Sequence, residues 1–199
     1  KGFCFIGNGF SVKCFIHIKN HLSFIVYSMK QNLVLYCFLG VDFMRILVMS
    51  DMHRRKSNFE RVLEKHPDIS EIFFLGDGAD DAAEIASFYK DKKFNILSGN
   101  CDFLSKYPSS GFYNINGVKI LATHGHTYGV KSSREHLLEA AKTEGVTLAL
   151  YGHTHIQMQE YSDGVYLICP GALGNSLDGP SYAIIDITDK GIMPSLLKL

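Results

Sequence analysis

The 199-residue chain has no excess charge of either sign, since 20 Lys and Arg residues balance 20 Asp and Glu residues. A neutral chain offers no electrostatic reason for nucleic acid or a charged membrane surface to be its main partner. Cysteine is scarce too: there are five, an odd number, and none forms a Cys-x-x-Cys pair. This pattern indicates neither a disulfide framework nor a structural zinc motif, and it favours a reducing, cytoplasmic setting.

Long hydrophobic runs are also lacking, because lysines, asparagines and histidines interrupt the apolar residues even in segment 1–43. No run approaches the roughly 18 apolar residues that a membrane-spanning helix needs. The same segment has no compact apolar block followed by a small-residue cleavage site, so it does not resemble a signal peptide. It carries four lysines against one aspartate, three of the five cysteines, and no clean helical or alternating period.

The character of the chain changes at Met44, where the stretch "MRILVMSDMH" begins. We therefore expect Met44 to be the natural start, so that residues 44–199 form one domain and residues 1–43 are an atypical, extraneous extension. The alternative is that residues 1–43 are a genuine apolar extension that binds a partner or a membrane surface.

From Met44 onward, buried-strand patterns alternate with helical patterns and are then followed by a strand-rich part. The first part predicts parallel strands joined by crossover helices. Its predicted strands are 44–50, 71–78 and 93–102, and its predicted helices are 57–67 and 80–90. The second part predicts strands within 111–125, 147–152, 156–171 and 181–199, with one helix over 132–145. We predict an α/β domain in which two sheets pack face to face with helices outside.

Five of the predicted strands end in side chains that commonly bind metal ions. In an open α/β sheet, ligands bind beyond the carboxyl ends of the strands, so these residues are expected at one edge. Histidines, carboxylates and an amide without a thiolate-rich set suit two divalent ions better than one structural zinc. The glycines before Asp77, Asn100 and His153 are expected where the chain turns sharply. The side chains are Asp51, His53, Asp77, Asn100, Cys101, Asp102, His124, His126, His153 and His155.

These motifs, in this order, resemble those of the calcineurin-like metallophosphoesterases, and more narrowly the small YfcE-type phosphodiesterases of bacteria and archaea. The resemblance implies a four-layer α-β-β-α sandwich of two mixed sheets flanked by helices. It also implies a phosphodiesterase that hydrolyses small phosphoesters with a hydroxide bridging two divalent ions, Mn²⁺ first and Ni²⁺, Zn²⁺, Fe²⁺ or Mg²⁺ as alternatives. Relatives of this size often form homodimers or homotetramers. No protein nucleophile is needed, which agrees with the absence of a Gly-x-Ser-x-Gly motif and of a P-loop.

The resemblance also assigns roles to residues by their place in the motifs. One ion is expected on Asp51, His53 and His155. The other is expected on Asn100, His124 and His153, and Asp77 should bridge the two ions.

Cys101 departs from the many relatives that carry a histidine after the asparagine. A neutral thiol is a poorer proton donor than an imidazole, so substrates with good leaving groups, and diesters over monoesters, should be preferred. The alternative is that Cys101 only packs. We expect Asp102 to orient a histidine ligand. His126, Asn100 and Arg54 are candidates for contact with the substrate phosphate, although His126 could equally be structural.

Three other functions share parts of this pattern. The His-x-His-x-Asp-His motif of metallo-β-lactamases is absent, because Ile156, Gln157 and Met158 follow His155. Nucleases with the same motifs are typically longer and carry added DNA-binding elements. A non-catalytic metal-binding scaffold of the same fold, such as the retromer subunit, would be expected to have lost ligands, whereas every ligand type is present here.

Overall fold

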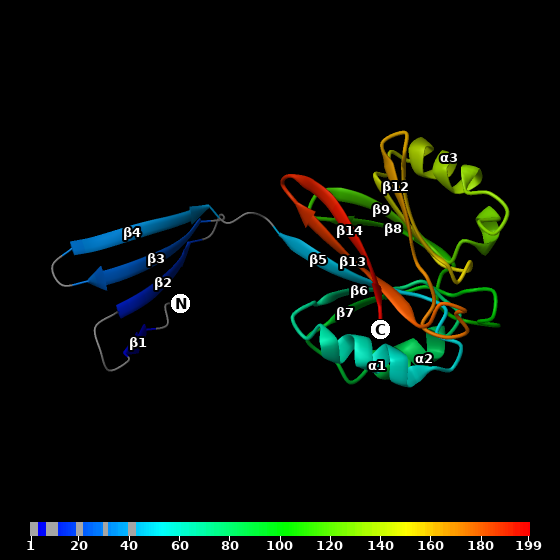
Figure 1. The fold of residues 1–199 in the computed structure, drawn as a ribbon, viewed down its shortest axis with the longest axis horizontal. Helices are drawn as coiled ribbons and strands as arrows, with labels where there is room; N and C mark the ends of the chain where they lie inside the picture. Colours follow the sequence, from blue (N-terminus) through cyan, green and yellow to red (C-terminus); the bar gives the residue numbers. More distant parts are fainter. Residues whose placement is uncertain (1–3, 7–11, 19–21, 30–31, 40–42) are drawn as a thin grey trace. The chain divides into compact units, whose positions relative to one another are not determined.

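Strand pairing divides the described part of the chain into three sheets. The computed structural model describes residues 4–6, 12–18, 22–29, 32–39 and 43–199, and the chain separates into two units, Lys1–Phe43 and Met44–Leu199. The first unit is an antiparallel sheet in the order β1-β2-β3-β4 (Figure 1). Its strands are β1 (Cys4–Ile6), β2 (Val12–Ile18), β3 (Leu22–Met29) and β4 (Asn32–Leu39). The extraneous origin of residues 1–43 stays a prediction.

The second unit contains two five-stranded sheets, with strand orders β14-β13-β5-β6-β7 and β11-β12-β10-β9-β8. The first sheet comprises β5 (Met44–Met49), β6 (Glu71–Phe74), β7 (Lys93–Ile96), β13 (Ser181–Thr188) and β14 (Gly191–Lys198). The second comprises β8 (Ser110–Ile115), β9 (Val118–Thr123), β10 (Leu148–Tyr151), β11 (Gln157–Ser162) and β12 (Val165–Pro170). The helices are α1 (Lys56–Lys65), α2 (Ala79–Ala86), the 3₁₀ turn η1 (His126–Tyr128) and α3 (Glu135–Thr143).

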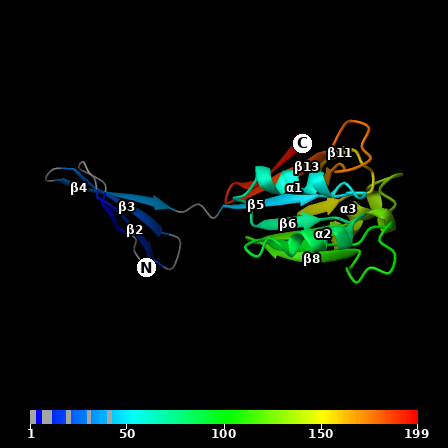
Figure 2. The same cartoon turned by 90° about the horizontal axis from the view of Figure 1, so that it is seen from below.

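Both sheets are mixed and are covered by helices on their outer faces (Figures 1 and 2). Strands β5, β6 and β7 run parallel, as do β9, β10 and β12, while β13 pairs antiparallel with β5. Helices α1 and α2 lie against the first sheet and α3 lies against the second. The predicted four-layer α-β-β-α sandwich is confirmed.

Alternation along β5 explains why this strand is apolar on both faces. Successive strand residues point to opposite sides of a sheet. Ile46 and Val48 therefore pack in the core between the two sheets, while Leu47 and Met49 pack in the core beneath α1 and α2. Such two-sided burial is typical of a central strand in a parallel sheet, and it holds β5 in place up to the loop that carries Asp51.

No helix in the described ranges, 43–199 and the four segments before them, is long and apolar enough to cross a membrane.

Candidate metal centre

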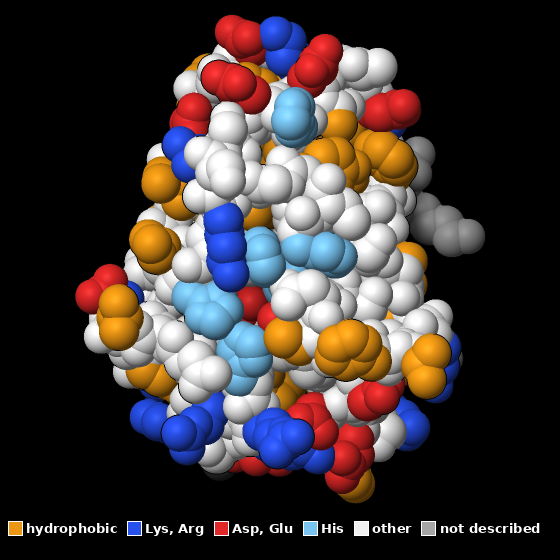
Figure 3. Space-filling model, turned by 90° about the vertical axis from the view of Figure 1, so that its right-hand side faces the viewer, with side chains coloured by type: hydrophobic (Ala, Val, Ile, Leu, Met, Phe, Trp, Pro, Cys, Tyr) orange, Lys and Arg blue, Asp and Glu red, His pale blue; other side chains and the backbone are white. Residues whose placement is uncertain are grey.

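The polar side chains predicted at strand ends lie together at one edge of the two sheets. The loop after β5 carries Asp51 and His53, the loop after β6 carries Asp77, and the loop after β7 carries Asn100. The second sheet supplies four further histidines from the segments after β9 and β10. Figure 3 shows histidine side chains gathered around buried carboxylates on this face.

The first donor group consists of Asp51, His53, Asp77 and His155, each of which offers one ligand atom within 4.8 Å of the others. His155 Nε2 lies 3.2 Å from Asp51 Oδ1 and 3.1 Å from His53 Nε2. His53 Nε2 in turn lies 3.7 Å from Asp77 Oδ2. The structure thus brings together the residues that the resemblance assigns to one ion, with Asp77 beside them.

The second donor group forms around His124 on the other side of Asp77. His124 Nε2 lies 3.0 Å from Asn100 Oδ1 and 3.6 Å from Asp77 Oδ1. The ring of His153 lies 5.0 Å from that of His124, centre to centre. The two Asp77 oxygens therefore face different groups, Oδ2 toward His53 and Oδ1 toward His124, so that this carboxylate lies between the two donor groups.

One oxygen of Asp51 tests whether these residues fit a metal ion. The Asp51 side chain is fully buried, and its Oδ2 accepts hydrogen bonds from Ser50 Oγ (2.6 Å) and the His153 backbone N–H (3.0 Å). Its Oδ1 accepts no hydrogen bond of good geometry among the described residues, although His155 Nε2 lies at ion-pair distance, 3.2 Å away, and the Nε2 atoms of His53 and His124 lie 4.0 Å away. A buried unsatisfied carboxylate oxygen is costly, and a divalent cation shared with those imidazoles would satisfy it. The residues fit a metal.

Backbone carbonyls orient two of the histidines. His124 Nδ1 lies 2.7 Å from the Leu75 carbonyl oxygen, and His155 Nδ1 lies 3.3 Å from that of Asn175. When Nδ1 donates to the carbonyl, the Nε2 lone pair faces the donor groups, which is how proteins commonly hold metal-binding histidines. The sequence did not point to Asn175, because it lies in the Gly- and Pro-containing loop between β12 and β13 with no motif of its own.

The pKa values of the neighbouring groups follow from their burial and charges. Burial, followed by the charges of His124 and Lys131, lowers the pKa of His153 to about 4, so this imidazole is neutral as a metal ligand must be. The pairing with Asp51 raises the pKa of His155 against the effect of burial. Burial alone would raise the pKa of Asp51, but His155, His124 and Ser50 outweigh it and hold this pKa below its usual value.

Several candidate ligands have left-handed backbone conformations, which non-glycine residues rarely adopt. Positive φ angles occur at Asp51 (54°), His53 (45°), Asp77 (59°), His153 (69°) and His155 (60°). Each costs on the order of 1 kcal/mol, and such residues cluster where function requires a fixed side-chain direction.

The glycines beside the candidate ligands are required for two different reasons. Gly76 has φ of 100°, and a Cβ there would lie 2.7 Å from Gly99 Cα, so it needs both the conformation and the space. Gly99 and Gly152 have ordinary φ angles, but a Cβ would overlap the Asp77 side chain or the Ser50 hydroxyl, respectively. The predicted need for a sharp turn therefore applies to Gly76, whereas the other two glycines permit close approach.

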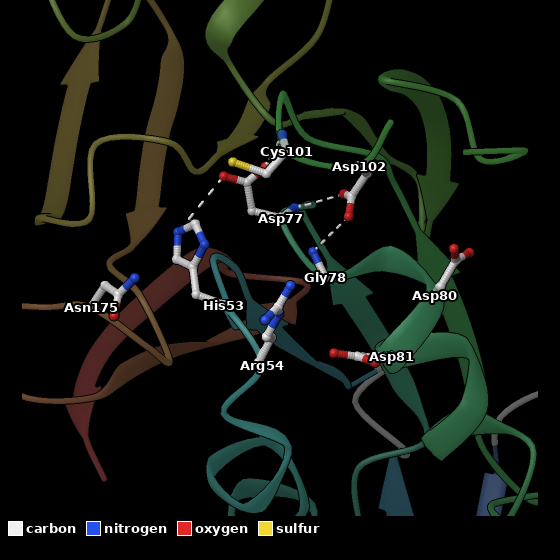
Figure 4. Close-up of a pocket in the computed structure, with 9 residues that line it drawn as sticks. All are labelled: His53, Arg54, Asp77, Gly78, Asp80, Asp81, Cys101, Asp102 and Asn175. Atoms are coloured by element: carbon white, nitrogen blue, oxygen red, sulfur yellow. Dashed lines mark hydrogen bonds and ion pairs between the residues drawn. The ribbon is translucent and has the colours of Figure 1, made fainter. Parts of the chain in front are cut away.

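The prediction that Asp102 orients a histidine ligand is wrong. Its carboxylate accepts four hydrogen bonds of 2.7–3.0 Å from the backbone N–H groups of Asp77, Gly78, Ala79 and Gly99. Figure 4 shows those from Asp77 and Gly78. No imidazole in the described part of the chain hydrogen-bonds to it. Asp102 instead fixes the loop that carries Asp77 and satisfies the first N–H groups of α2.

Cys101 lies directly at the candidate centre. Its backbone N–H donates to Asp77 Oδ1 at 2.8 Å, and Asn100 Nδ2 lies 3.4 Å from its sulfur. Burial, together with the hydrogen bond and charge of Asp77, raises the pKa of the thiol to about 11. Cys101 is therefore a neutral thiol at neutral pH.

His126 and Arg54 lie on opposite sides of the donor groups. The His126 ring is 5.4 Å from that of His124, and its buried Nδ1 finds no hydrogen-bond partner in residues 43–199. Burial and the charge of His124 lower its pKa. Arg54 follows His53 directly and lines the neighbouring cavity (Figure 4).

That cavity, of about 450 Å³, opens beside the first donor group and is large enough for a small substrate. Among the described residues that line it, Arg54 is the single Lys or Arg. The lining residues are His53, Arg54, Asp77, Gly78, Asp80, Asp81, Cys101, Asp102 and Asn175.

Replacing Asp102 tests its structural role. Asp102→Ala leaves four backbone N–H groups without their acceptor, so we expect the free energy of unfolding to fall by about 2 kcal/mol or more. Asp102→Asn keeps one acceptor oxygen and should lose less. Urea unfolding of the full chain in excess chelator measures this apart from metal binding, with Asp163→Asn in an exposed turn as the control. Unchanged stability of Asp102→Ala would contradict the assignment.

Comparisons with known proteins agree with this geometry. The calcineurin-like phosphoesterase superfamily domain matches residues 44–190. Over 147 residues the chain is 26% identical to the probable metallophosphoesterase YsnB of Bacillus subtilis, covering 72% of this chain and 85% of that protein. It is also 26% identical to phosphodiesterase MJ0936 of Methanocaldococcus jannaschii over 172 residues, covering 74% and 95% respectively.

A solved structure shares the fold at lower identity. Vacuolar protein sorting 29 from Cryptosporidium parvum superposes with a TM-score of 0.63 at 16% identity, covering 79% of this chain and 98% of that one. The family match over most of the chain is the deciding observation. The chain belongs to the calcineurin-like phosphoesterase superfamily.

Proposed function

We propose that this protein is a divalent-metal-dependent phosphodiesterase that acts on small phosphoesters. The observation that carries the proposal is the buried Asp51 Oδ1, which lies unsatisfied within 4.0 Å of three imidazole nitrogens. Around it lie the other six side chains expected to hold two ions. A bound cation would account for a carboxylate oxygen left in this state, and the proposed enzyme requires such a cation.

The two donor groups divide the proposed ligands. One ion would be held by Asp51, His53 and His155, and the other by Asn100, His124 and His153. Asp77 would bind both ions. Two such ions supply Lewis-acid polarisation of the phosphoryl oxygens and lower the pKa of a bound water to near neutrality. Mn²⁺ suits this mixture of imidazole, carboxylate and amide donors, and Ni²⁺, Zn²⁺, Fe²⁺ and Mg²⁺ are alternatives.

The chain's other residues position the substrate. Arg54, which lines the cavity, and the Asn100 amide beside His124 would bind phosphoryl oxygens, and His126 is a further candidate on the side of His124. The carboxylates of Asp80 and Asp81 line the same cavity. Asp81 is paired with Lys56 Nζ at 3.0 Å, so it is mainly the negative charge of Asp80 that would oppose a dianionic monoester more than a monoanionic diester, which supports diesters as the substrate class.

Cys101 also supports diesters as the substrate class. A neutral thiol is a poorer proton donor to a leaving oxygen than an imidazole, so the reaction would depend on leaving groups that need little protonation. We infer that Cys101 limits the enzyme to esters of acidic alcohols.

The runner-up function is a non-catalytic scaffold, since Vps29 has this fold. The complete donor set favours the enzyme. Assembly into homodimers or homotetramers stays a prediction.

Hydrolysis of bis-p-nitrophenyl phosphate by the full chain tests the proposal. After chelator treatment we expect no turnover, and added Mn²⁺ should restore turnover that is faster for the diester than for p-nitrophenyl phosphate. Asp51→Asn should lower kcat/KM by roughly 100-fold or more, because it removes a ligand charge. Asp163→Asn serves again as the matched control. If no divalent ion restores turnover in the folded protein, the scaffold is the better account.

Replacing Cys101 by a better proton donor tests its effect on leaving groups. For Cys101→His we expect the rate with phenyl esters to rise by about tenfold or more relative to p-nitrophenyl esters, since general acids contribute about 10²–10⁴-fold. Cys101→Ser supplies no such donor and is the control. The measurement is kcat/KM against the pKa of the leaving phenol, and equal slopes for all three proteins would exclude this role for Cys101.

A further inference from the structure

Large hydrophobic side chains are exposed in the loops that carry the candidate metal centre. Nine such side chains are exposed among the described residues, and four of them lie in just three loops. We call these four the apolar rim. Its members are Phe103 (87% exposed), Leu104 (104%), Ile156 (60%) and Leu177 (104%).

Each member of the apolar rim lies within two residues of the site. Phe103 and Leu104 follow Asp102, Ile156 follows His155, and Leu177 is two residues beyond Asn175. Figure 3 shows hydrophobic side chains next to the histidines on this face. Exposed hydrophobic residues scattered singly are ordinary, but several in the loops that carry one polar site point to contact with a ligand or partner there.

The backbone of Leu104 is a second, independent observation. Its φ of 57° is left-handed, a conformation that a bulky residue rarely adopts, and the side chain is fully exposed. Because the strained residue points its apolar side chain to solvent, packing within the fold does not offset the cost of its backbone conformation. It is expected where a loop is shaped to contact a ligand.

The cavity itself explains why a substrate would need the apolar rim. Its lining consists of histidine, arginine, aspartate, asparagine, glycine and Cys101, so it provides polar contacts for the phosphoryl group but contains no Val, Ile, Leu, Met, Phe or Tyr side chain. A phosphodiester has two ester groups, and an ester group that extends from the cavity would meet the surrounding loops. Those loops present the apolar rim.

We propose that the apolar rim binds an apolar ester group of the substrate, alkyl or aromatic, and thereby selects phosphodiesters that carry one. This inference rests on the proposed function and specifies the substrate class of the same site. The group bound is the ester that does not leave, so the apolar rim acts through substrate binding and not through the chemical step.

A series of p-nitrophenyl diesters tests the proposal, because all share one leaving group. The full chain with Mn²⁺ is assayed with methyl, butyl and phenyl p-nitrophenyl phosphates. We expect kcat/KM for the butyl or phenyl ester to exceed that for the methyl ester by about tenfold, the effect of burying roughly two methylene groups. The comparison of butyl with phenyl separates an alkyl chain from an aromatic ring.

Substitution of the apolar rim shows whether it causes this preference. In the double variant Phe103→Ser/Leu177→Ser, kcat/KM for the butyl or phenyl ester relative to that for the methyl ester should fall toward one. The change should lie mainly in KM. Phe88→Ser is the matched control, since Phe88 is 78% exposed beyond the C-terminal end of α2, away from the cavity. A wild-type ratio near one, or a ratio that the substitutions leave unchanged, overturns the proposal.

A binding measurement separates failure of the apolar rim from failure of the proposed function. If no diester is hydrolysed, the proposed function fails, and calorimetry with dibutyl and dimethyl phosphate then decides on the apolar rim alone. Tighter binding of dibutyl phosphate that depends on Phe103 and Leu177 supports it, and equal or absent binding overturns it. If the substitutions instead dissociate an oligomer in gel filtration without changing ester preference, the surface is a subunit contact and the proposal is overturned.

Discussion

The buried carboxylate of Asp51 is the constraint on which the candidate centre depends. Its Oδ2 is held by Ser50 at the end of β5 and by the His153 backbone after β10, so one side chain ties together the loops of both sheets. That arrangement leaves Oδ1 without a hydrogen bond of good geometry in the described chain and directs it at the imidazoles. Burying an unsatisfied carboxylate is unfavourable unless another group neutralises it, and the surrounding donors suit a divalent cation.

The rest of the fold holds this unfavourable arrangement in place. Left-handed residues and close backbone approaches at Gly76, Gly99 and Gly152 all add cost at one edge of the sheets. The cost is offset by the strands behind them, whose side chains are buried on both faces. Asp102 adds four hydrogen bonds that fix the Asp77 loop. Stability thus comes from the sandwich, and the loops at its edge are free to serve the site.

Much of this organisation could be predicted from the sequence. Apolar runs that end in Asp, His or Asn indicated parallel strands with ligands at their carboxyl ends, and the order of the motifs indicated the family. Each of these signals is local to a few residues. The contacts of Asp102 could not be predicted in the same way, because its four N–H partners lie on two separate segments that only the fold brings together.

Two further features could not be predicted from the sequence, for physical reasons. The Asn175 contact to His155 is made by a backbone carbonyl, which any residue type could supply. The apolar rim is spread over three loops, and no period links Phe103, Ile156 and Leu177 along the chain. Its members became recognisable as one surface only through their exposure beside the cavity.

Titration of the chelator-treated full chain with Mn²⁺, followed by electron paramagnetic resonance, tests the account most directly. We predict that about two ions bind per chain and that their spectrum shows the exchange coupling of a pair bridged by a carboxylate. Asp77→Ala should abolish the coupling because it removes the shared ligand. Binding of one ion or none to the folded wild-type protein, or two ions without coupling, would contradict a centre bridged by Asp77.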